Sequence, residues 1–285
     1  MNIIDTTNNI SEVYTSGSFD LDRWKEYMDK CIQGAKDKCF NDMMECQESG
    51  FLFEESMLPI LNNVMTDEDN KKKAIRSFHE VTDDLEARII SVFHKSIDVD
   101  VILYLGLCNG AGWVTDVNEK TTVLLGIEKI LELGWCDIDS MNGLIIHELG
   151  HAYHDRYGRF KINTESSQDG FLWRLFTEGV AMAFEQEVVG DPVYYHQGKN
   201  GWKKWCDEHR RLIVDSFCTD LKTMTRENQR YFGDWVSFNG YHDVGYYLGA
   251  EFVRYMMKND KFDNIINYGL EDIKKEFEIF ATQFG

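Results

Sequence analysis

Prolines are almost absent from this chain: its 285 residues contain two, Pro59 and Pro192. Because proline breaks helices and removes a backbone donor, a sequence with so few of them can form long helices. Apolar residues make up 43% of the chain and aromatic residues 13%, far from the composition of a disordered protein. A chain of this length can also bury a large core. We expect a compact, mostly helical fold.

The spacing of apolar residues changes twice along the chain. It first recurs at three and four, which predicts helices over 21–47, 53–65 and 67–96. Between 98 and 130, β-branched residues separated by turn residues predict a small sheet. Helical spacing returns over 138–157, 170–189, 202–221, 242–258 and 269–282. The predicted fold class is α+β, predominantly helical, with a small mixed sheet.

No internal repeat, low-complexity tract or linker rich in Pro, Gly and Ser requires a domain boundary. We therefore expect a single domain over residues 1–285. Within it, a helical N-terminal section over about 1–97 precedes a core over about 98–285.

The chain is strongly acidic, with 49 acidic against 30 basic residues and a formal net charge of −19. Such a chain repels nucleic-acid phosphates and gains none of the counterion release on which their binding depends. The N-terminus lacks a basic segment followed by an apolar one, and no run of about 18 apolar residues follows. The seven cysteines include no CxxC pair. We expect a cytoplasmic protein that binds neither nucleic acid nor membrane.

The stretch HELGH, residues 147–151, places two histidines four positions apart with a glutamate after the first. On a helix these histidines differ by about 400°, so both imidazoles project on one side, one turn apart. A zinc ion with nitrogen ligands at about 2.0–2.1 Å can bind both. Glu148 lies about 100° around the helix from His147, where a base for a metal-bound water belongs. The apolar residues 144–146 indicate a buried helix, in which a metal would offset the burial of polar groups.

A second apolar helix, predicted over 171–187, carries Glu178 among hydrophobic neighbours. Gly179 and Ala181 beside it, and Gly150 on the first helix, would allow the two helices to approach closely. Glu178 is then the candidate for a third protein ligand. The alternative is that Glu178 caps a helix or forms a salt bridge with a neighbour. Three protein ligands leave the fourth position of a zinc ion for water, which is typical of a catalytic site.

Such a site supports the hydrolysis of peptide bonds. The metal would lower the pKa of its water towards about 7 and polarise the substrate carbonyl. Glu148 would take a proton from the water and pass it to the leaving amine. We therefore expect a zinc-dependent peptidase with one Zn2+ per chain and a peptide or protein as its substrate.

HELGH, followed by TEGVA at 177–181, resembles the gluzincin group of zinc metallopeptidases, which share an HExxH helix and a glutamate ligand on a following helix. The chain is most similar to bacterial predicted zinc proteases in which a Thr-Glu-Gly motif follows HExxH. GYYLG at 245–249 resembles a later motif of such proteins, and the resemblance covers about residues 120–258. It implies a zincin-like metallopeptidase core. The residues that it implies are the metal ligands His147, His151 and Glu178 and the catalytic base Glu148.

The chain departs from two branches of these peptidases. Metzincins have glycine and histidine at the positions of His154 and Tyr157, so that branch is excluded. Thermolysin-like enzymes carry an aspartate that orients a histidine four residues after the glutamate ligand, where this chain has Met182. The orienting group must come from elsewhere. Its candidates are His154, Asp155 and Glu185, each equally explained as polarity of a helix surface.

Zincins of this type bind the substrate backbone along an exposed edge strand upstream of the metal helix, and the segment 121–130 is the candidate by position. Gly126 would allow close approach there, although an internal strand with ordinary packing is the alternative. Glu128 partly resembles the glutamate of the Gly-x-Met-Glu-Asn motif, which holds the substrate amine in metallo-aminopeptidases. The segment 126–129 of this chain lacks the methionine and the asparagine of that motif. Endopeptidase and aminopeptidase activities both stay open.

A donor beyond the metal usually stabilises the negative charge of the tetrahedral intermediate. The segment 239–256 offers Tyr241 and Tyr246, which we favour over His242, near the start of a helix. The alternative is that these tyrosines belong to the core. The remaining histidines look isolated and are expected at the surface or as satisfied core residues; they include His79, His94, His196 and His209.

A non-catalytic protein is the alternative hypothesis. A binding or regulatory protein derived from the same fold would keep the HExxH helix as a structural zinc site, with its acidic surface towards a partner. Water at the fourth coordination position in an open cleft indicates a peptidase, whereas a protein ligand such as His154 or His242 indicates a structural site. A chance match to the motif without a metal is the third possibility.

Overall fold

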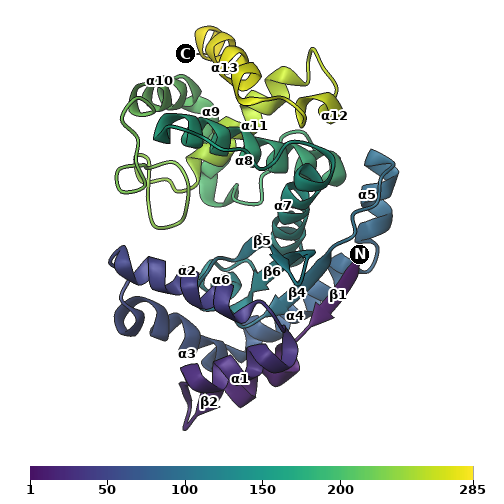
Figure 1. Ribbon diagram of the computed structural model, residues 1–285, viewed down its shortest axis with the longest axis vertical. Coiled ribbons are helices and arrows are strands. Elements are labelled where there is room, and N and C mark those ends of the chain that lie inside the picture. The colour runs from purple at the N-terminus through teal and green to yellow at the C-terminus, as the bar shows by residue number, and fades with distance from the viewer. Residues whose placement is uncertain (285) are drawn as a thin grey trace. The chain divides into compact units, whose positions relative to one another are not determined.

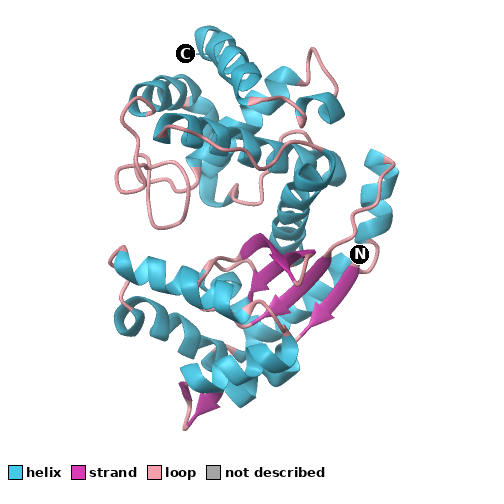
Figure 2. Cartoon of the chain, viewed as in Figure 1, coloured by secondary structure: helices cyan, strands magenta, loops and turns pink. Residues whose placement is uncertain are grey.

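The strands and helices are described for residues 1–284 of a computed structural model, and they confirm an α+β fold that is mostly helical with a small mixed sheet (Figure 2). The chain forms two compact units, Met1–Glu148 and Leu149–Gly285. The division falls inside helix α7 (Ile138–Tyr157), which continues through it without a break. The single domain and the zincin-like core stay predictions. None of the helices described combines the length and apolar composition needed to cross a membrane.

The first unit contains the three helices that the sequence predicts, in five shorter pieces, and one helix that it does not predict. They are α1 (Leu21–Cys31), α2 (Lys36–Glu48), α3 (Leu58–Thr66), α4 (Glu68–Thr82), α5 (Leu85–Phe93) and α6 (Ile127–Glu132). A 3-10 helix (Thr7–Val13), a short hairpin of β2 (Tyr14–Thr15) and β3 (Ser18–Phe19), and a π-helical turn (Phe53–Met57) complete the N-terminal section.

Two of the predicted helices are each broken in two. The segment 21–47 is interrupted between α1 and α2 at Gly34, whose φ of +97° lies in the left-handed region that favours glycine. An added Cβ at Gly34 would also lie 2.5 Å from Oδ1 of Asn118, so a side chain there would have to displace the amide of Asn118. The segment 67–96 is interrupted between α4 and α5, where Asp84 is the N-cap of α5.

The sheet has the strand order β1-β4-β6-β5, and its strands are β1 (Asn2–Asp5), β4 (Asp100–Tyr104), β5 (Gly112–Val117) and β6 (Lys120–Gly126). Strands β1, β4 and β6 run parallel, and β5 is antiparallel to β6. Asn118 and Glu119 join β5 to β6 and both have positive φ, as a tight hairpin turn requires. The pairing of β1 with β4 spans almost 100 residues, and the sequence analysis missed it.

The prediction that 121–130 forms an exposed edge strand is wrong. Strand β6 lies between β4 and β5, ends at Gly126, and is followed at once by helix α6. The continuous burial of residues 122–126 fits an internal strand, which is covered on both faces. The edge strands are β1 and β5, and the side chains of β5 are mostly half-buried.

Glu128 is buried at the start of α6, with 1% of its surface exposed. Its carboxylate accepts hydrogen bonds from the backbone N–H groups of Gly106 at 2.8 Å and Cys108 at 3.1 Å. The side chain therefore holds the loop between β4 and β5. Burial raises the pKa of Glu128 to about 7, although the two backbone hydrogen bonds oppose that shift.

Replacing Glu128 with glutamine is expected to change how stability depends on pH. Between pH 4.5, the ordinary pKa of the group, and about 7, the folded chain keeps a proton that the unfolded chain has released. The contribution of Glu128 to the free energy of unfolding is therefore full below that interval. It falls as pH rises through the interval, by up to about 1.4 kcal/mol per pH unit. Urea unfolding from about pH 5 to about pH 8 measures this. Wild type should lose stability more steeply than Glu128→Gln, and parallel profiles would contradict the assignment.

The second unit is helical, and helix α8 (Ser167–Val189) packs against α11 (Val244–Met256) and α13 (Leu270–Phe284) (Figure 1). The side chain of Ser166 caps α8 by accepting from the backbone of Asp169. The predicted helix over 202–221 is interrupted at His209. The remaining helices of this unit are α9 (Trp202–Glu208), α10 (Arg210–Asp220) and α12 (Phe262–Ile265).

Glycines mark two close helix contacts. The expected approach of α7 to α8 occurs at Gly150, where an added Cβ would lie 2.8 Å from Cα of Ala181. Gly179 does not take part in that contact. It faces α11 instead, and an added Cβ there would lie 2.2 Å from the carbonyl oxygen of Gly249. The glycines of the TEGVA and GYYLG motifs thus meet where α8 and α11 touch.

Candidate metal centre

Helix α7 has the bounds that the sequence predicts. Asp137 caps its start, since Oδ1 of Asp137 accepts from the backbone N–H of Ser140 at 2.9 Å. Residues 143–150 are all buried, so the helix presents its motif from within the protein rather than from its surface. At its end, the N–H of Gly158 donates to the carbonyl of His154.

The structure brings the predicted ligands His147, His151 and Glu178 together. One donor atom from each lies within 4.8 Å of the others. Nε2 of His151 lies 3.2 Å from Oε2 of Glu178. Two ligand atoms on a tetrahedral zinc ion, with bonds of 2.0–2.1 Å, stand roughly 3.3 Å apart, so the pair fits such an ion. His147 is buried and the other two are partly exposed.

His147 lies just before the division of the chain, and the other members of this group lie after it. The division does not interrupt helix α7, which holds His147 and His151 four residues apart. The rise and turn of the helix fix the two imidazoles relative to each other, as the sequence spacing predicts.

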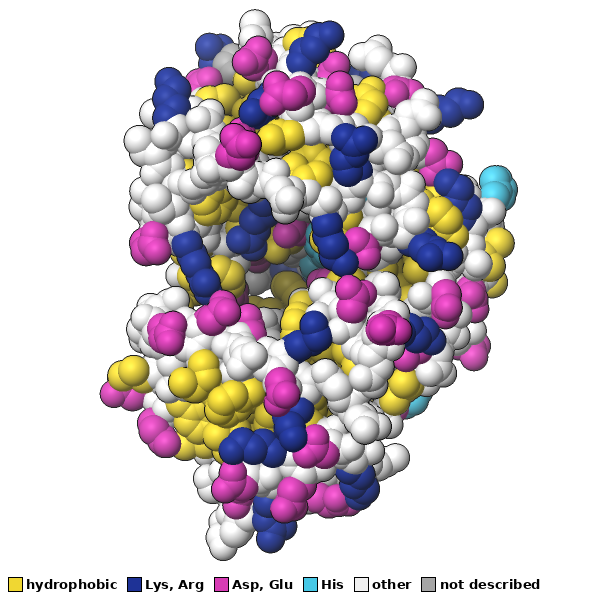
Figure 3. Space-filling model, viewed as in Figure 1, with side chains coloured by type: hydrophobic (Ala, Val, Ile, Leu, Met, Phe, Trp, Pro, Cys, Tyr) yellow, Lys and Arg dark blue, Asp and Glu magenta, His cyan; other side chains and the backbone are white. Residues whose placement is uncertain are grey.

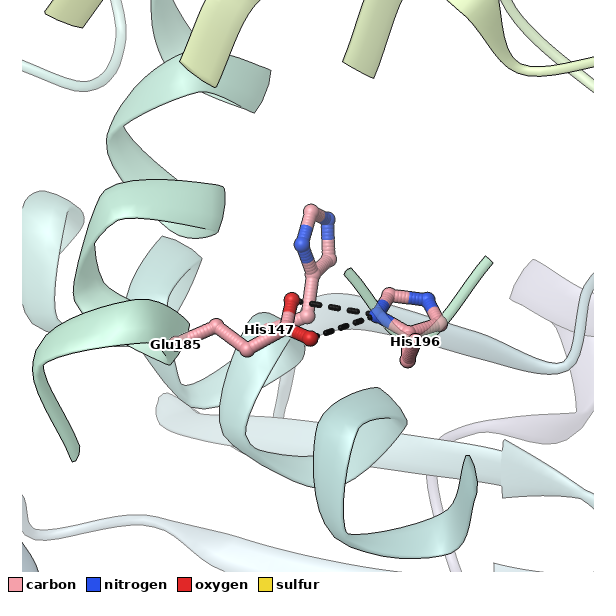
Figure 4. Close-up of side chains that lie close together, drawn as sticks. All are labelled: His147, Glu185 and His196. Carbon is pink, nitrogen blue, oxygen red and sulfur yellow. Dashed lines mark hydrogen bonds and ion pairs between the residues drawn. The ribbon is translucent and has the colours of Figure 1, made fainter. Parts of the chain in front are cut away.

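A second group that can hold a metal ion shares His147 and adds Glu185 from α8 and His196 from the loop after it (Figure 4). All three side chains are buried, with exposed fractions of 3%, 0% and 4%. Nδ1 of His196 lies 2.9 and 3.0 Å from the two carboxylate oxygens of Glu185. This carboxylate and imidazole therefore satisfy each other inside the protein.

His196 is a satisfied core residue, which is one of the two outcomes that the sequence predicts, but it is not isolated. Its partner lies 11 residues earlier on α8, and the intervening loop turns back to bring the ring to Glu185. No spacing rule connects a helix residue with a loop residue at that separation. The sequence YYH at 194–196 is aromatic, and this was the sign in the sequence that the loop packs inward. Tyr195, next to His196, is indeed buried.

Of the three candidates for orienting the ligands, Glu185 is the one grouped with His147. Nε2 of His154 lies 3.1 Å from the carbonyl of Ile266 instead, and burial, followed by the charge of His151, lowers the pKa of His154 to about 3. Asp155 pairs with Lys161 at 3.3 Å. Among residues 1–284, neither His154 nor His242 belongs to a group that can hold a metal, and Nδ1 of His242 lies 2.5 Å from the carbonyl of Val236.

Arg174 lies one turn before Glu178 on α8. Its Nε is 3.8 Å from Oε1 of Glu178, and its guanidinium lies over the ring of Phe232 at 4.8 Å. The salt bridge that the sequence analysis kept as an alternative for Glu178 therefore exists alongside the metal group. It uses one carboxylate oxygen, while the other faces His151.

Tyr246 and Tyr241 occupy different surroundings. Tyr246 packs edge-on against Phe232, with ring centres 6.2 Å apart, so it lies on the ring that carries Arg174. Tyr241 stacks on Trp205 at 4.2 Å, in the loop before α11. The packing connects Tyr246 to Glu178 through two side chains. The role of either tyrosine as a donor stays a prediction.

Glu148 lies against the edge strand, a contact that the sequence analysis missed. An added Cβ at Gly112, the first residue of β5, would lie 2.6 Å from Cγ and 2.8 Å from Oε1 of Glu148. Only a residue without a side chain can occupy position 112 while Glu148 stays in place. The carboxylate is therefore next to the backbone of a strand whose outer edge is unpaired in the sheet.

No protein-family model, no curated protein and no solved structure matches the chain. The function of the chain is therefore inferred from the geometry of the two metal-binding groups and of Glu148.

Proposed function

We propose that this protein is a zinc-dependent peptidase of the gluzincin type. The observation that carries the proposal is the grouping of His147, His151 and Glu178, with Glu148 on the same helix as the two histidines. Two imidazoles and one carboxylate leave a position for solvent on a tetrahedral ion, which is the arrangement of a catalytic zinc site. The partial exposure of His151 and Glu178 is consistent with an ion that substrate can reach.

In this proposal, His147, His151 and Glu178 would hold the zinc ion. When bound, zinc would polarise the scissile carbonyl and make water a nucleophile near neutral pH. Glu148 takes the proton from the attacking water and returns it to the departing amine. Tyr246 is our candidate for the hydrogen-bond donor to the developing oxyanion. It is favoured over Tyr241 because it packs on the ring that Arg174 covers.

The substrate would be a peptide or protein that adds to the free edge of strand β5. An extended peptide gains main-chain hydrogen bonds from such an edge whatever its side chains. Gly112 supports this placement because it brings the edge backbone directly to Glu148. A scissile bond paired near Gly112 would then lie within reach of the proposed base.

We propose that Glu185 orients the imidazole ring of His147. Metal-binding histidines usually have a carboxylate or carbonyl near their second nitrogen, which fixes the ring. Glu185 fits this role because it is fully buried and grouped with His147, and because Met182 cannot supply it. His196 would in turn hold the carboxylate of Glu185 in place.

The second candidate function is a non-catalytic zinc-containing protein. It is favoured by the burial of the His147, Glu185 and His196 group, since an ion enclosed there has no room for substrate and would be structural. For either function we place the protein in the cytoplasm. All seven cysteines are free thiols, which suits a reducing compartment.

Zinc titration of four variants separates the two functions. For a peptidase, wild type binds one zinc ion, His151→Ala loses stoichiometric binding, and His196→Phe and Glu185→Gln keep the stoichiometry with affinity lowered by about 10–100-fold. For a structural site, His196→Phe loses the ion and His151→Ala keeps it. His94→Asn is the control, because His94 is exposed and asparagine tolerates its φ of +56°. Wild type without zinc affinity would overturn both functions.

A further inference from the structure

An apolar groove of about 510 Å³ lies in the first unit, and none of its lining residues belongs to a metal-binding group. Helices α1 and α2 and the segment 52–55 form its walls. Its lining residues are Leu21, Phe40, Met43, Met44, Gln47, Leu52, Phe53, Glu54 and Glu55. Figure 3 shows apolar side chains gathered on the part of the surface where α2 and α3 lie in Figure 1.

Exposed apolar side chains concentrate at this groove. Met44, Phe51 and Leu52 are 41%, 40% and 49% exposed, and they are three of the nine large hydrophobic residues that are exposed among residues 1–284. Single apolar residues on a surface are ordinary, whereas a contiguous set marks a binding surface. The three side chains lie within nine positions of one another, next to the lining of one groove. The groove is therefore a candidate binding surface.

The charged residues that line the groove are all acidic. Glu54 and Glu55 are exposed and form no ion pair within the described part of the chain. Lys25 lies over the ring of one lining residue, Phe40, and is already paired with Asp22 at 2.9 Å. The carboxylates of Glu54 and Glu55 thus lie at an apolar surface without a cationic partner in the described part of the chain, and they favour a partner with positive charge.

We propose that this groove docks an amphipathic helix of a partner protein, with its apolar face in the groove and lysine or arginine at its margin against Glu54 and Glu55. The lining residues lie on helices, a π-helical turn and a loop, so no strand edge is present for a peptide to pair with. Recognition must come from side chains, as in other helix-binding grooves. Met43 and Met44 supply flexible apolar contacts that adapt to such a helix.

The same charges disfavour two other occupants. A second copy of this chain would bring its own Glu54 and Glu55 and a net charge of −19 to the same interface. A fatty acid or an anionic membrane surface would meet the two carboxylates with like charge. A basic amphipathic helix gains from both the apolar lining and the acidic margin.

Fluorescence anisotropy with two labelled helical peptides of about 18 residues tests the proposal. One carries leucine on one face and lysine on the other; its counterpart has glutamate in place of lysine. We expect the full chain to bind the lysine peptide and not the glutamate peptide. The double variant Met44→Lys, Leu52→Lys should weaken binding at least tenfold, or about 1.4 kcal/mol. Glu54→Gln, Glu55→Gln should weaken it less and reduce its salt dependence.

Leu212→Lys, Ile279→Lys is the matched control, because these residues are exposed apolar side chains of the second unit. It adds the same charge to the chain and should leave binding close to that of wild type. Equal weakening by this control would show attraction to the net charge alone and overturn the proposal. So would unchanged binding by the groove variant, or concentration-dependent dimers that the groove variant abolishes. All the altered side chains are exposed, and thermal unfolding checks that each variant is folded.

Discussion

Glu148→Gln is expected to lower kcat for peptide hydrolysis by about 10²–10⁴-fold while zinc binding stays unchanged. Glutamine keeps the size of the side chain, so it still fits against Gly112, but it cannot accept the proton of the attacking water. The two histidines and Glu178 keep their donor atoms, so the ion is held as before. Hydrolysis of fluorescent casein and zinc stoichiometry, measured on the same preparation, test both parts.

Glu80→Gln is the control for this experiment, because Glu80 is exposed on α4 and the same chemical change there should alter neither measurement. If Glu148→Gln hydrolyses casein at the wild-type rate, Glu148 is not the base. If it loses zinc together with activity, Glu148 acts as a ligand and the assignment of the metal group is wrong. Zinc retention together with a loss of turnover is specific to the proposed role.

Gly249→Val is expected to cost about 3 kcal/mol of stability or more. An added Cβ at Gly249 would lie 2.5 Å from the carbonyl oxygen of Leu175 and 2.9 Å from the backbone nitrogen of Gly179. Both neighbours are backbone atoms of α8, which cannot turn aside as a side chain would, so the two helices must separate. Glu178 precedes Gly179 on α8, and we expect weaker zinc binding from the same variant. Urea unfolding and zinc titration measure the two effects.

A glycine at a roomy position on α8 provides the comparison. A Cβ added at Gly170 would lie 3.5 Å from its nearest neighbour, Oγ1 of Thr164, and the φ of Gly170 is not positive. Gly170→Ala should leave stability unchanged or raise it by up to about 1 kcal/mol, because alanine favours a helix. A Gly249→Val variant as stable as wild type would mean that α8 and α11 do not touch through their backbones.

The sequence predicted best what depends on local patterns. Helix α7 has its predicted bounds because Asp137 caps it and because its apolar spacing is unbroken up to Tyr157. The spacing of His147 and His151 on that helix placed two imidazoles on one side without any knowledge of the rest of the fold. Glu178 was identified because an acid on an apolar helix requires a partner, and the structure groups it with both histidines.

What the sequence did not predict depends on contacts between distant segments. Strand β1 joins the sheet beside β4, and β6 is internal because it pairs with both β4 and β5. Gly179 was expected to face α7 because small residues permit close approach, but small size does not say to which neighbour. The pairing of Glu185 with His196 needs the path of a loop, which no periodicity encodes.

Helix α7 carries both proposed histidine ligands and the proposed base within five consecutive residues, and the helix is uninterrupted. Inserting or deleting one residue of that helix before His147 would rotate all three side chains by about 100° relative to the preceding part of the helix and the core residues that it contacts. Length variation among homologues of this chain should therefore occur in loops that carry none of these side chains, and be absent between Asp137 and Gly158.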